Sequence, residues 1–425
     1  MQMHGETKLA RIGILGFGRE GKSVLKYLKK SSQFKKAKIE ILDKKISGSY
    51  LQNLNRFDVI FRSPGIPYNL PELKRARRDG VYFSSVTKLF FENYKGKIIG
   101  ITGTKGKGTT STLLYKILKS SGKKVFLAGN IGKSAVDSLT KFGDYPLAVL
   151  ELSSFQLQDL DSSPTIAVML DVFPDHQDAH LNLKEYYEAK VNIGRFQKKT
   201  DKIFFFADNA MSRKLAAKSP AKKNPVDYRK FRSFGLEDLK IKGLHNFRNA
   251  VVAATVAENL GVSKAVIKKE VEKFTGLEHR LEFVKKLGRI SFYNDSSSTN
   301  PQTTVAAIEA FGKEPKVLIA GGYDKGLDYA PLSSSLNKHK ETTVVLFGEN
   351  KNKIRAAIKD SVKIKIVKDL KEAVRTACEI AKAKTARSQK IINCYVIFSP
   401  GAASFDSFRD YADRGDQFKK IVAAL

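Results

Sequence analysis

A glycine-rich stretch between an apolar run and a helical pattern most constrains what this chain can fold into. Residues 98–102 (Ile-Ile-Gly-Ile-Thr) form the apolar run and predict a buried β-strand. Residues 103–110 (Gly-Thr-Lys-Gly-Lys-Gly-Thr-Thr) follow, and residues 111–118 show the apolar spacing of a helix. A strand, a glycine loop and a helix in this order bind phosphate, because glycines allow a close approach and loop amides point at the anion.

The lysine and the hydroxyl groups of this loop predict an ATP site. Lys107 is placed to reach the terminal phosphates, and a hydroxyl that follows it would hold Mg²⁺. The usual motif has Ser or Thr directly after the lysine, whereas here Gly108 takes that position and Thr109 comes one residue later. A turn without a ligand is the alternative, and a Gly-x-Gly-Lys sequence between a strand and a helix rarely serves only as a turn.

A second nucleotide-type turn lies near the start of the chain. Residues 16–21 read Gly-Phe-Gly-Arg-Glu-Gly between a predicted strand at 11–15 and a predicted helix, which is typical of a pyrophosphate-binding turn. The next strand, 39–42, ends at Asp43, which would bind a ribose in a dehydrogenase. Nothing nearby supplies hydride chemistry, so we expect binding here, with a nicotinamide-dependent dehydrogenase as an alternative.

Ionisable side chains follow the next strands. Glu151 ends an apolar strand after the glycine loop, where Mg²⁺ needs a carboxylate. His176 follows another strand and is a ligand or base candidate, or else a satisfied loop histidine. Lys190 lies on a predicted helix at 183–196, and by itself it would be interpreted as a solvated lysine.

The rest of the chain predicts further α/β structure. Residues 198–240 are polar without a clear period, and an apolar helix then starts at His245 and places Asn246 and Asn249 on one face. Beyond it, strands alternate with helices, and polar loops follow the strands, as in doubly wound sheets. We therefore predict an α/β protein of three domains: a Rossmann-like domain (1–93), a central P-loop ATPase-like domain (94–277) and a C-terminal Rossmann-like domain (278–425).

Charge and composition limit the function classes. The net charge of +33 would attract nucleic acid, but the lysines are dispersed and accompany no nucleic-acid-binding motif. A basic nucleic-acid-binding P-loop protein stays as an alternative, and a substrate with phosphates and carboxylates would also profit from the charge. No apolar run reaches the ~18 residues of a membrane span, the first ten residues lack a signal-peptide core, and Cys378 and Cys394 have no metal spacing. We expect a cytoplasmic protein that does not contact the membrane.

Read together, these stretches resemble the Mur ligase family, the ATP-dependent amino-acid ligases of peptidoglycan synthesis. The resemblance extends nearly end to end and keeps the motif order, and the branch that joins D-glutamate to UDP-N-acetylmuramoyl-L-alanine is most similar. The stretches that carry it are 100–110, 129–132, 151–157 (Glu-Leu-Ser-Ser-Phe-Gln-Leu), Asp175-His176, His245-Asn246, His279-Arg280 and 399–408.

The resemblance implies a monomeric enzyme that uses ATP, two Mg²⁺ ions and a carbamylated lysine. The implied catalytic residues are Lys107, Glu151, His176 and Lys190. The implied ATP contacts are Gly103, Thr104, Lys105, Gly106, Lys107, Gly108, Thr109, Asn246, Asn249, Arg280 and Asp295. The implied metal ligands are Thr109, Glu151, His176 and the carbamate of Lys190. The implied UDP-sugar contacts are Gly16, Phe17, Gly18, Asp43, Ser63 and Asn130. The implied D-glutamate contacts are Thr299, Lys325, Ser404 and Tyr411.

Two positions depart from the pattern of the D-glutamate-adding branch. Gly108 replaces the hydroxyl residue after the loop lysine, as in the related folylpolyglutamate synthases, so Thr109 is expected to take over its role. Ser297 stands where a lysine is usual, which affects phosphate neutralisation and the choice of amino acid. A folylpolyglutamate synthase, or a Mur ligase for another amino acid, is therefore the enzyme alternative, although the first domain has no evident role in folate binding.

Overall fold

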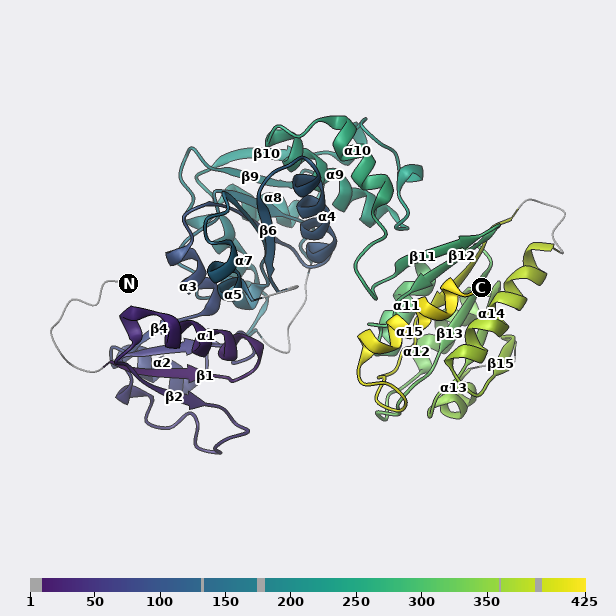
Figure 1. Ribbon diagram of the computed structural model, residues 1–425, viewed down its shortest axis with the longest axis horizontal. Coiled ribbons are helices and arrows are strands. Elements are labelled where there is room, and N and C mark those ends of the chain that lie inside the picture. The colour runs from purple at the N-terminus through teal and green to yellow at the C-terminus, as the bar shows by residue number, and fades with distance from the viewer. Residues whose placement is uncertain (1–9, 131–133, 174–179, 359–360, 387–391) are drawn as a thin grey trace. The chain divides into compact units, whose positions relative to one another are not determined.

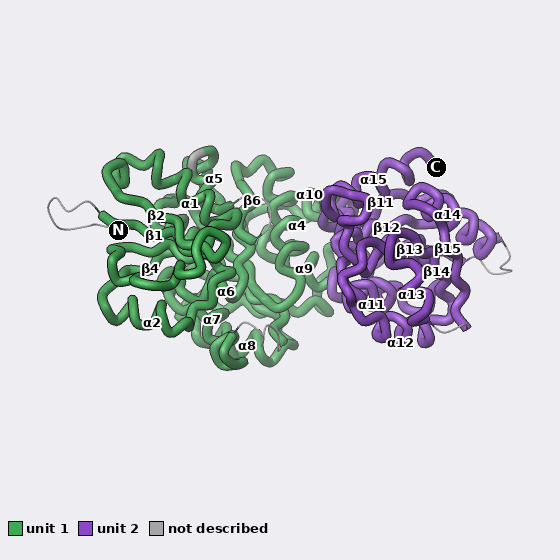
Figure 2. Tube along the Cα trace, turned by 90° about the horizontal axis from the view of Figure 1, so that it is seen from below, with its two compact units in different colours: residues 1–234, 248–271 green, residues 235–247, 272–425 purple. Residues whose placement is uncertain are grey.

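The computed structural model describes residues 10–130, 134–173, 180–358, 361–386 and 392–425. The described chain forms two compact units, coloured separately in Figure 2: residues 1–234 with 248–271, and residues 235–247 with 272–425. Two β-sheets belong to the first unit and one to the second. The predicted division into three domains corresponds in number to these three sheets, and its boundaries stay a prediction.

The first sheet is parallel and has the strand order β2-β1-β3-β4. Its strands and helices are β1 (Arg11–Leu15), α1 (Arg19–Lys30), β2 (Lys38–Leu42), β3 (Val59–Arg62), α2 (Pro71–Arg78), β4 (Tyr82–Ser84) and α3 (Val86–Asn93) (Figure 1). Neighbouring residues of β1 point to opposite faces: Ile14 packs with Leu28 of α1, whereas Leu15 packs with Leu73 of α2. Helices therefore cover both faces, as the Rossmann-like pattern predicts.

The central sheet is also parallel, in the order β10-β9-β8-β5-β7-β6. Its strands are β5 (Lys97–Thr102), β6 (Val125–Gly129), β7 (Leu147–Glu151), β8 (Ile166–Met169), β9 (Lys202–Phe206) and β10 (Lys222–Val226). Its helices are α4 (Lys107–Ser120), α5 (Ala135–Phe142), α6 (Ser154–Leu157), α7 (Leu183–Arg195) and α8 (Ala210–Ala217), and α9 (Leu244–Asn259) and α10 (Lys264–Lys273) follow. Strand β5 lies in the middle, so the glycine loop emerges between β7 and β8.

Residues 198–240, whose sequence shows no clear period, nevertheless form regular structure. This segment contains β9, α8 and β10, and the run Ile203 to Phe206 of β9 is buried. The strand has only five residues, and lysines and turn residues flank it, so its pattern was hidden by polar neighbours.

The sheet of the second unit has the order β11-β12-β16-β13-β14-β15, with an antiparallel β11 at one edge and parallel pairs elsewhere. The strands are β11 (Glu282–Leu287), β12 (Ile290–Asn294), β13 (Lys316–Ala320), β14 (Thr342–Leu346), β15 (Ile364–Ile366) and β16 (Cys394–Phe398). The helices are α11 (Pro301–Glu309), α12 (Ala330–Lys338), α13 (Lys351–Ala357), α14 (Leu370–Ala386) and α15 (Tyr411–Ala423). Val317 packs in a core with α14 and α15, whereas Leu318 packs in a core with α11, α12 and α13. The sheet is thus doubly wound.

Within the described parts of the chain, no helix is both long and apolar enough to cross a bilayer.

Candidate functional site

The glycine loop connects β5 to α4 as the sequence predicts, and the helix begins at Lys107. Gly106 precedes it with φ +84°, a left-handed conformation that favours glycine. A Cβ atom on Gly106 would lie 2.3 Å from Oδ1 of Asn249, so the loop packs directly against α9. The structure therefore brings together Gly106 and Asn249, two residues that the sequence assigns to the same nucleotide.

Lys107 folds back over the loop. Its ammonium group donates hydrogen bonds to the carbonyl oxygens of Gly103, at 3.2 Å, and Thr104, at 3.0 Å. Gly108 and Thr109 are half-buried in the first turn of α4, and Lys105 is exposed. The first-turn amides of a helix have no partners within that helix, so this end of α4 is suited to bind an anion.

Thr104 fastens the loop to the segment after β8. Its hydroxyl lies 2.8 Å from the Tyr186 hydroxyl of α7, and it accepts a hydrogen bond from the backbone amide of Phe173 at 2.9 Å. The Thr104 amide donates to the carbonyl of Asp171 at 2.8 Å. These bonds tie the start of the glycine loop to α7 and to the segment after β8.

Glu151 ends β7, next to the loop strand β5. Its side chain is buried, and its Oε1 accepts a hydrogen bond from the side-chain amide of Asn130 at 3.1 Å. Its Oε2 is buried and has no hydrogen-bond partner among the residues that the structure describes. A buried carboxylate oxygen without a partner is costly, and a divalent cation is a partner that would satisfy it, so Glu151 fits Mg²⁺.

Lys190 is buried in α7, with a relative exposure of 1%, and is not a solvated surface lysine. Its ammonium donates to the Gly103 carbonyl at 2.9 Å and lies over the ring of Tyr186. Lys107 donates to the same carbonyl, so the structure brings both lysines to the glycine loop. His176, the other implied metal ligand, lies outside the described residues.

Arg248 of α9 is a site residue that sequence reasoning missed. Its guanidinium binds two carboxylates, Asp171 after β8 and Asp208 after β9, at distances of 2.6 to 3.2 Å. Burial would lower the pKa of Arg248, but the hydrogen bonds to Asp208 and Asp171 outweigh it and raise that pKa. The hydrogen bond from Arg248 lowers the pKa of the Asp208 carboxyl. Arg248 thereby fixes its neighbour Asn249 beside the loop, and only the tertiary structure reveals the two acids.

The first glycine turn is held by the residues that the sequence singles out. Asp43 accepts hydrogen bonds from the backbone amides of Phe17, at 2.5 Å, and Lys45, at 2.9 Å, and these two bonds lower its pKa. The Ser63 hydroxyl donates to the Gly16 carbonyl at 2.7 Å. Gly18 is exposed at the start of α1.

This turn also contacts the central sheet. The guanidinium of Arg19 lies 3.5 Å from the carbonyl oxygen of Asn130. Gln156 of α6 donates to Glu20 at 3.1 Å, and burial raises the pKa of that carboxyl. The structure thus places the turn at residues 16–21 near Asn130, and the assignment of both to one binding site stays a prediction.

In the second unit, Asp295 follows β12 and is buried. It accepts hydrogen bonds from the Ser399 hydroxyl, at 2.7 Å, and from the Leu281 amide, at 3.1 Å. Burial raises the pKa of Asp295 to about 7, although these bonds oppose the rise. Arg280 is exposed on the turn before β11, and the Asn246 side chain donates to the Lys242 carbonyl at 2.8 Å.

Thr299, Lys325 and Ser404, three of the expected amino-acid contacts, lie on three loops, and Arg414 joins the loops of Thr299 and Ser404. This buried arginine of α15, which sequence reasoning missed, donates to the carbonyls of Ser296, Ala402 and Ala403 at 2.9 to 3.0 Å. Burial lowers the pKa of Arg414 to about 10. Tyr323 pairs with Ala403, which brings the loop of Lys325 to the loop of Ser404.

The side chains of these loops differ in exposure. Lys325 is exposed over the Phe405 ring, Ser404 is buried, and Thr299 is half-buried. Tyr411 is exposed, and its carbonyl accepts from the Ser296 hydroxyl at 2.7 Å. The structure joins the loops but shows no direct contact among these four side chains.

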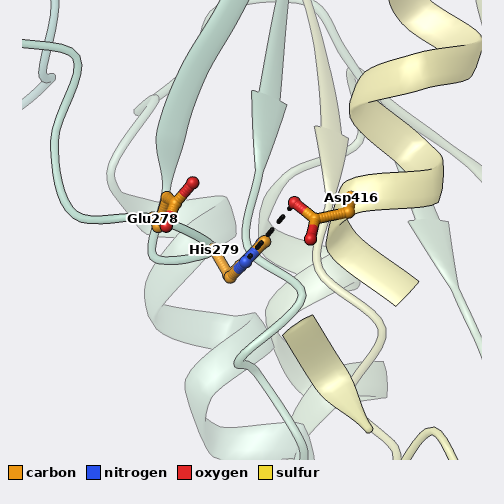
Figure 3. Close-up of side chains that lie close together, drawn as sticks. All are labelled: Glu278, His279 and Asp416. Atoms are coloured by element: carbon orange, nitrogen blue, oxygen red, sulfur yellow. Dashed lines mark ion pairs between the residues drawn. The ribbon is translucent and has the colours of Figure 1, made fainter. Parts of the chain in front are cut away.

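A cluster of Glu278, His279 and Asp416 also has a geometry that could hold a cation (Figure 3). Lys419 lies within 3.0 Å of both carboxylates, which are largely exposed. Nε2 of His279 faces Asp416 at 3.8 Å, and its Nδ1 lies 3.0 Å from the Asn294 amide. The ammonium of Lys419 already balances these acids, so an ion-pair network explains the cluster.

Fold and site together define a P-loop α/β nucleotide-binding protein with a second nucleotide-type turn. The models of the Mur ligase middle domain and of the Mur ligase glutamate ligase domain match residues 101–240 and 279–387, respectively. The chain belongs to the Mur ligase family.

Similar proteins cover most of the chain. The UDP-N-acetylmuramoylalanine–D-glutamate ligase of Acetivibrio thermocellus is 36% identical over 88% of this chain and 84% of its own length. That of Clostridium botulinum is 31% identical over 98% and 97%. Among solved structures, the UDP-N-acetylmuramate-alanine ligase of Thermotoga maritima has a TM-score of 0.56 at 18% identity, covering 97% of this chain and 99% of its own. The MurF ligase of Thermotoga maritima in complex with ADP has a TM-score of 0.53 at 17% identity, covering 99% and 96%. These structures show the same fold.

Proposed function

We propose that this protein joins D-glutamate to UDP-N-acetylmuramoyl-L-alanine at the expense of ATP. Similarity to D-glutamate ligases over most of the chain supports the substrates. The observation that carries the chemistry is the buried Oε2 of Glu151, which has no hydrogen-bond partner in the described parts of the chain, beside a loop with Lys107. The alternative of a nucleic-acid-binding protein has only the net charge in its favour.

In the central sheet, ATP would lie on the loop at residues 103–109, with its phosphates on the first-turn amides of α4. Lys107 would exchange its two carbonyl partners for phosphate oxygens. Mg²⁺ would be held by Glu151 and Thr109, and when bound it neutralises charge on the phosphates. We further propose that His176 and a carbamate on Lys190 serve a second ion.

The other sheets would bind the remaining groups. The UDP-sugar would lie at Gly16, Phe17, Gly18, Asp43 and Ser63, with Asn130 beside it. Asn246 and Asn249 would contact adenine, and Arg280 and Asp295 would reach the nucleotide from the second unit. D-Glutamate would lie among Thr299, Lys325, Ser404 and Tyr411. We propose a monomer acting in the cytoplasm.

The reaction would proceed in two steps. A carboxylate oxygen of the UDP-sugar substrate attacks the γ-phosphorus, ADP leaves, and an acyl phosphate forms. Lys107 stabilises the charge of the transferring phosphoryl group. The amine of D-glutamate then attacks the acyl carbon, the amide bond forms, phosphate leaves, and the amine loses its proton.

Phosphate release tests this proposal. The protein is given ATP, Mg²⁺ and UDP-N-acetylmuramoyl-L-alanine with a panel of D- and L-amino acids, and a folate substrate is tested separately. We expect D-glutamate to give the highest kcat/KM. Release that depends on another amino acid, or on the folate, would reject the assignment.

A further inference from the structure

A basic hollow lies at the amino ends of the central strands, at the opposite edge of the sheet from the glycine loop. Its volume is about 800 Å³. Lys97, which begins β5, and Leu147, which begins β7, both line it. Ligands of parallel α/β sheets ordinarily bind at the carboxyl ends of the strands, so this hollow is separate from the site proposed above.

The hollow is strongly positive. Four lysines line it, Lys95, Lys97, Lys123 and Lys124, against one carboxylate, Asp144. None of the four ammonium groups forms an ion pair with any residue that the structure describes. Several like charges around one cavity repel one another, and a multiply charged anion would reverse this repulsion.

Aromatic and apolar side chains complete the walls. Tyr145, Pro146 and Leu260 line the same hollow. An adjoining hollow of about 520 Å³ shares Lys123, Lys124 and Tyr145 and adds the ring of Tyr115. The two adjoining hollows therefore offer both charged and apolar surface.

Two residues that line the hollow, Gly96 and Tyr145, are held by Tyr94. The Tyr94 hydroxyl donates to the Tyr145 carbonyl at 2.5 Å, and the Tyr94 ring packs edge-on against Phe126. A Cβ atom at Gly96 would come within 2.4 Å of the Tyr94 hydroxyl oxygen, so the close packing depends on this glycine. Walls that are already ordered lose less conformational entropy when a ligand binds.

We propose that this hollow binds a nucleotide, with its phosphates on the four lysines and its base against Tyr145 and Tyr115. The volume lies in the ~300–1,000 Å³ range of small-ligand sites. A diphosphate concentrates two or three negative charges, which suits the four ammonium groups, and bases stack on aromatic rings. The inference does not depend on the proposed function.

The position of the hollow keeps its ligand apart from the glycine loop. Strand β5 spans the distance from Lys97 to Thr102, directly before the loop, and β7 runs from Leu147 to Glu151. At ~3.3 Å per residue these strands are roughly 15 Å long. The ligand would therefore lie at the far end of the two strands that carry the loop and Glu151, without overlapping the ATP.

Lysine acetylation followed by mass spectrometry tests the site. The intact protein is labelled in the presence of ADP, UDP or inorganic pyrophosphate, and the rate at each lysine is compared with that of the free protein. At a nucleotide concentration about ten times the dissociation constant, labelling of Lys97, Lys123 and Lys124 should slow about tenfold. The exposed pair Lys29 and Lys30 of α1 should be unaffected. ADP and UDP differ in their base. Whichever of them protects the lysines from acetylation at the lower concentration shows which base the hollow prefers.

Substitutions locate the effect. Lys123→Gln with Lys124→Gln should abolish the protection of Lys97, whereas the matched change Lys29→Gln with Lys30→Gln should preserve it, and both proteins should keep wild-type kcat. If neither nucleotide slows labelling in the hollow while one of them protects Lys107, the proposal is wrong. Equal protection by pyrophosphate would reject a nucleotide as the ligand.

Discussion

Asn130 and Glu151 are joined twice, at the adjacent ends of β6 and β7. The backbone amide of Asn130 donates to the Glu151 carbonyl at 3.0 Å, and its side-chain amide donates to Oε1 at 3.1 Å. Gly129 allows this approach, since a Cβ atom there would lie 2.2 Å from the same carbonyl oxygen. These bonds orient the carboxylate, and its buried Oε2 has no hydrogen-bond partner among the described residues.

The change Glu151→Gln should lower kcat by about 100-fold or more, because it removes one charge from a preorganised site. The amide keeps the shape of the side chain and an oxygen that accepts from Asn130, so the melting temperature should hardly change. Mg²⁺ titrations of phosphate release should show a higher Mg²⁺ requirement. A normal Mg²⁺ titration in the variant would show that Glu151 does not bind the metal.

The change Gly106→Ala should raise the KM for ATP and lower the melting temperature. An alanine methyl group would lie 2.3 Å from Asn249 Oδ1, and the φ of +84° costs a further ~1 kcal/mol for a residue with a Cβ. The double variant Gly106→Ala with Asn249→Ala removes the clash but not the strain. It should recover part of the stability, and a double variant no more stable than Gly106→Ala would contradict this account.

The strands that position the site could be predicted because each is a short apolar run with a polar residue at its end. The runs before Gly103, Asp43 and Glu151 predict β5, β2 and β7 in this way, and the alternation of strands and helices in the last part of the chain predicts the third sheet. Parallel strands present their carboxyl ends at one edge, so the proximity of Glu151 to the loop follows from the sequence.

The residues that hold the loops together could not be predicted. Arg248 and Arg414 are single arginines on helices, and each binds a residue far away in the sequence, Asp171 and Ser296, respectively. The burial of Lys190 depends on how α7 packs, which the helical period alone does not fix. Strand β9 could not be predicted because its apolar run is short and lies within a long polar segment.

The change Arg62→Met should destabilise the first unit by about 3 to 5 kcal/mol, because it leaves a buried carboxylate without its cation. The side chains of Arg62 of β3 and Asp159 are buried, and their charged groups are 2.9 Å apart. Arg62 binds Oδ2 of Asp159, whereas Oδ1 has no hydrogen-bond partner in the described chain. Thermal unfolding followed by circular dichroism measures the effect.

Two controls isolate the buried pair. Arg56 pairs with Glu40 at the surface of the same sheet. The change Arg56→Met should therefore lower the free energy of unfolding by at most about 1 kcal/mol. Changing Asp159→Leu together with Arg62→Met should recover much of the loss. A double variant as unstable as Arg62→Met would mean that lost packing, not the unpaired charge, is the cause.

The change Asp295→Asn should stabilise the second unit more at pH 8 than at pH 5. Burial raises the pKa of Asp295 to about 7, whereas an unfolded aspartate has a pKa near ~4. Between these values only the folded state holds the proton, so the free energy of unfolding falls as the pH rises through this window. Asparagine cannot ionise, so the variant escapes this loss. The difference in unfolding free energy between variant and wild type should be on the order of 2 kcal/mol larger at pH 8 than at pH 5. Urea unfolding of both proteins at both pH values measures this difference. A difference between variant and wild type that does not change with pH would contradict the prediction.

The last prediction is that Lys190 acts as a carbamate. Its amine would attack CO₂, form an N–C bond and lose a proton, which turns a buried cation into an anion with carboxylate-like oxygens. As an ammonium group, Lys190 donates a hydrogen bond to the Gly103 carbonyl at 2.9 Å. It also adds positive charge to a site that is expected to hold Mg²⁺. A carbamate would instead supply oxygen ligands, which Mg²⁺ prefers.

Two measurements test the carbamate. With ¹³C-labelled bicarbonate, the ¹³C spectrum of the wild-type protein should show a carbamate signal that Lys190→Met lacks. Lys190→Ala should be nearly inactive, because it removes a ligand of the phosphoryl-transfer site, and acetate should partly restore its turnover by occupying the vacated position. Lys190→Arg keeps the charge but cannot form this carbamate, so it should fail with or without bicarbonate. The ammonium and carbamate forms of Lys190 place opposite charges beside the glycine loop. Near-normal turnover of Lys190→Arg in CO₂-depleted buffer would therefore show that the residue works as a cation.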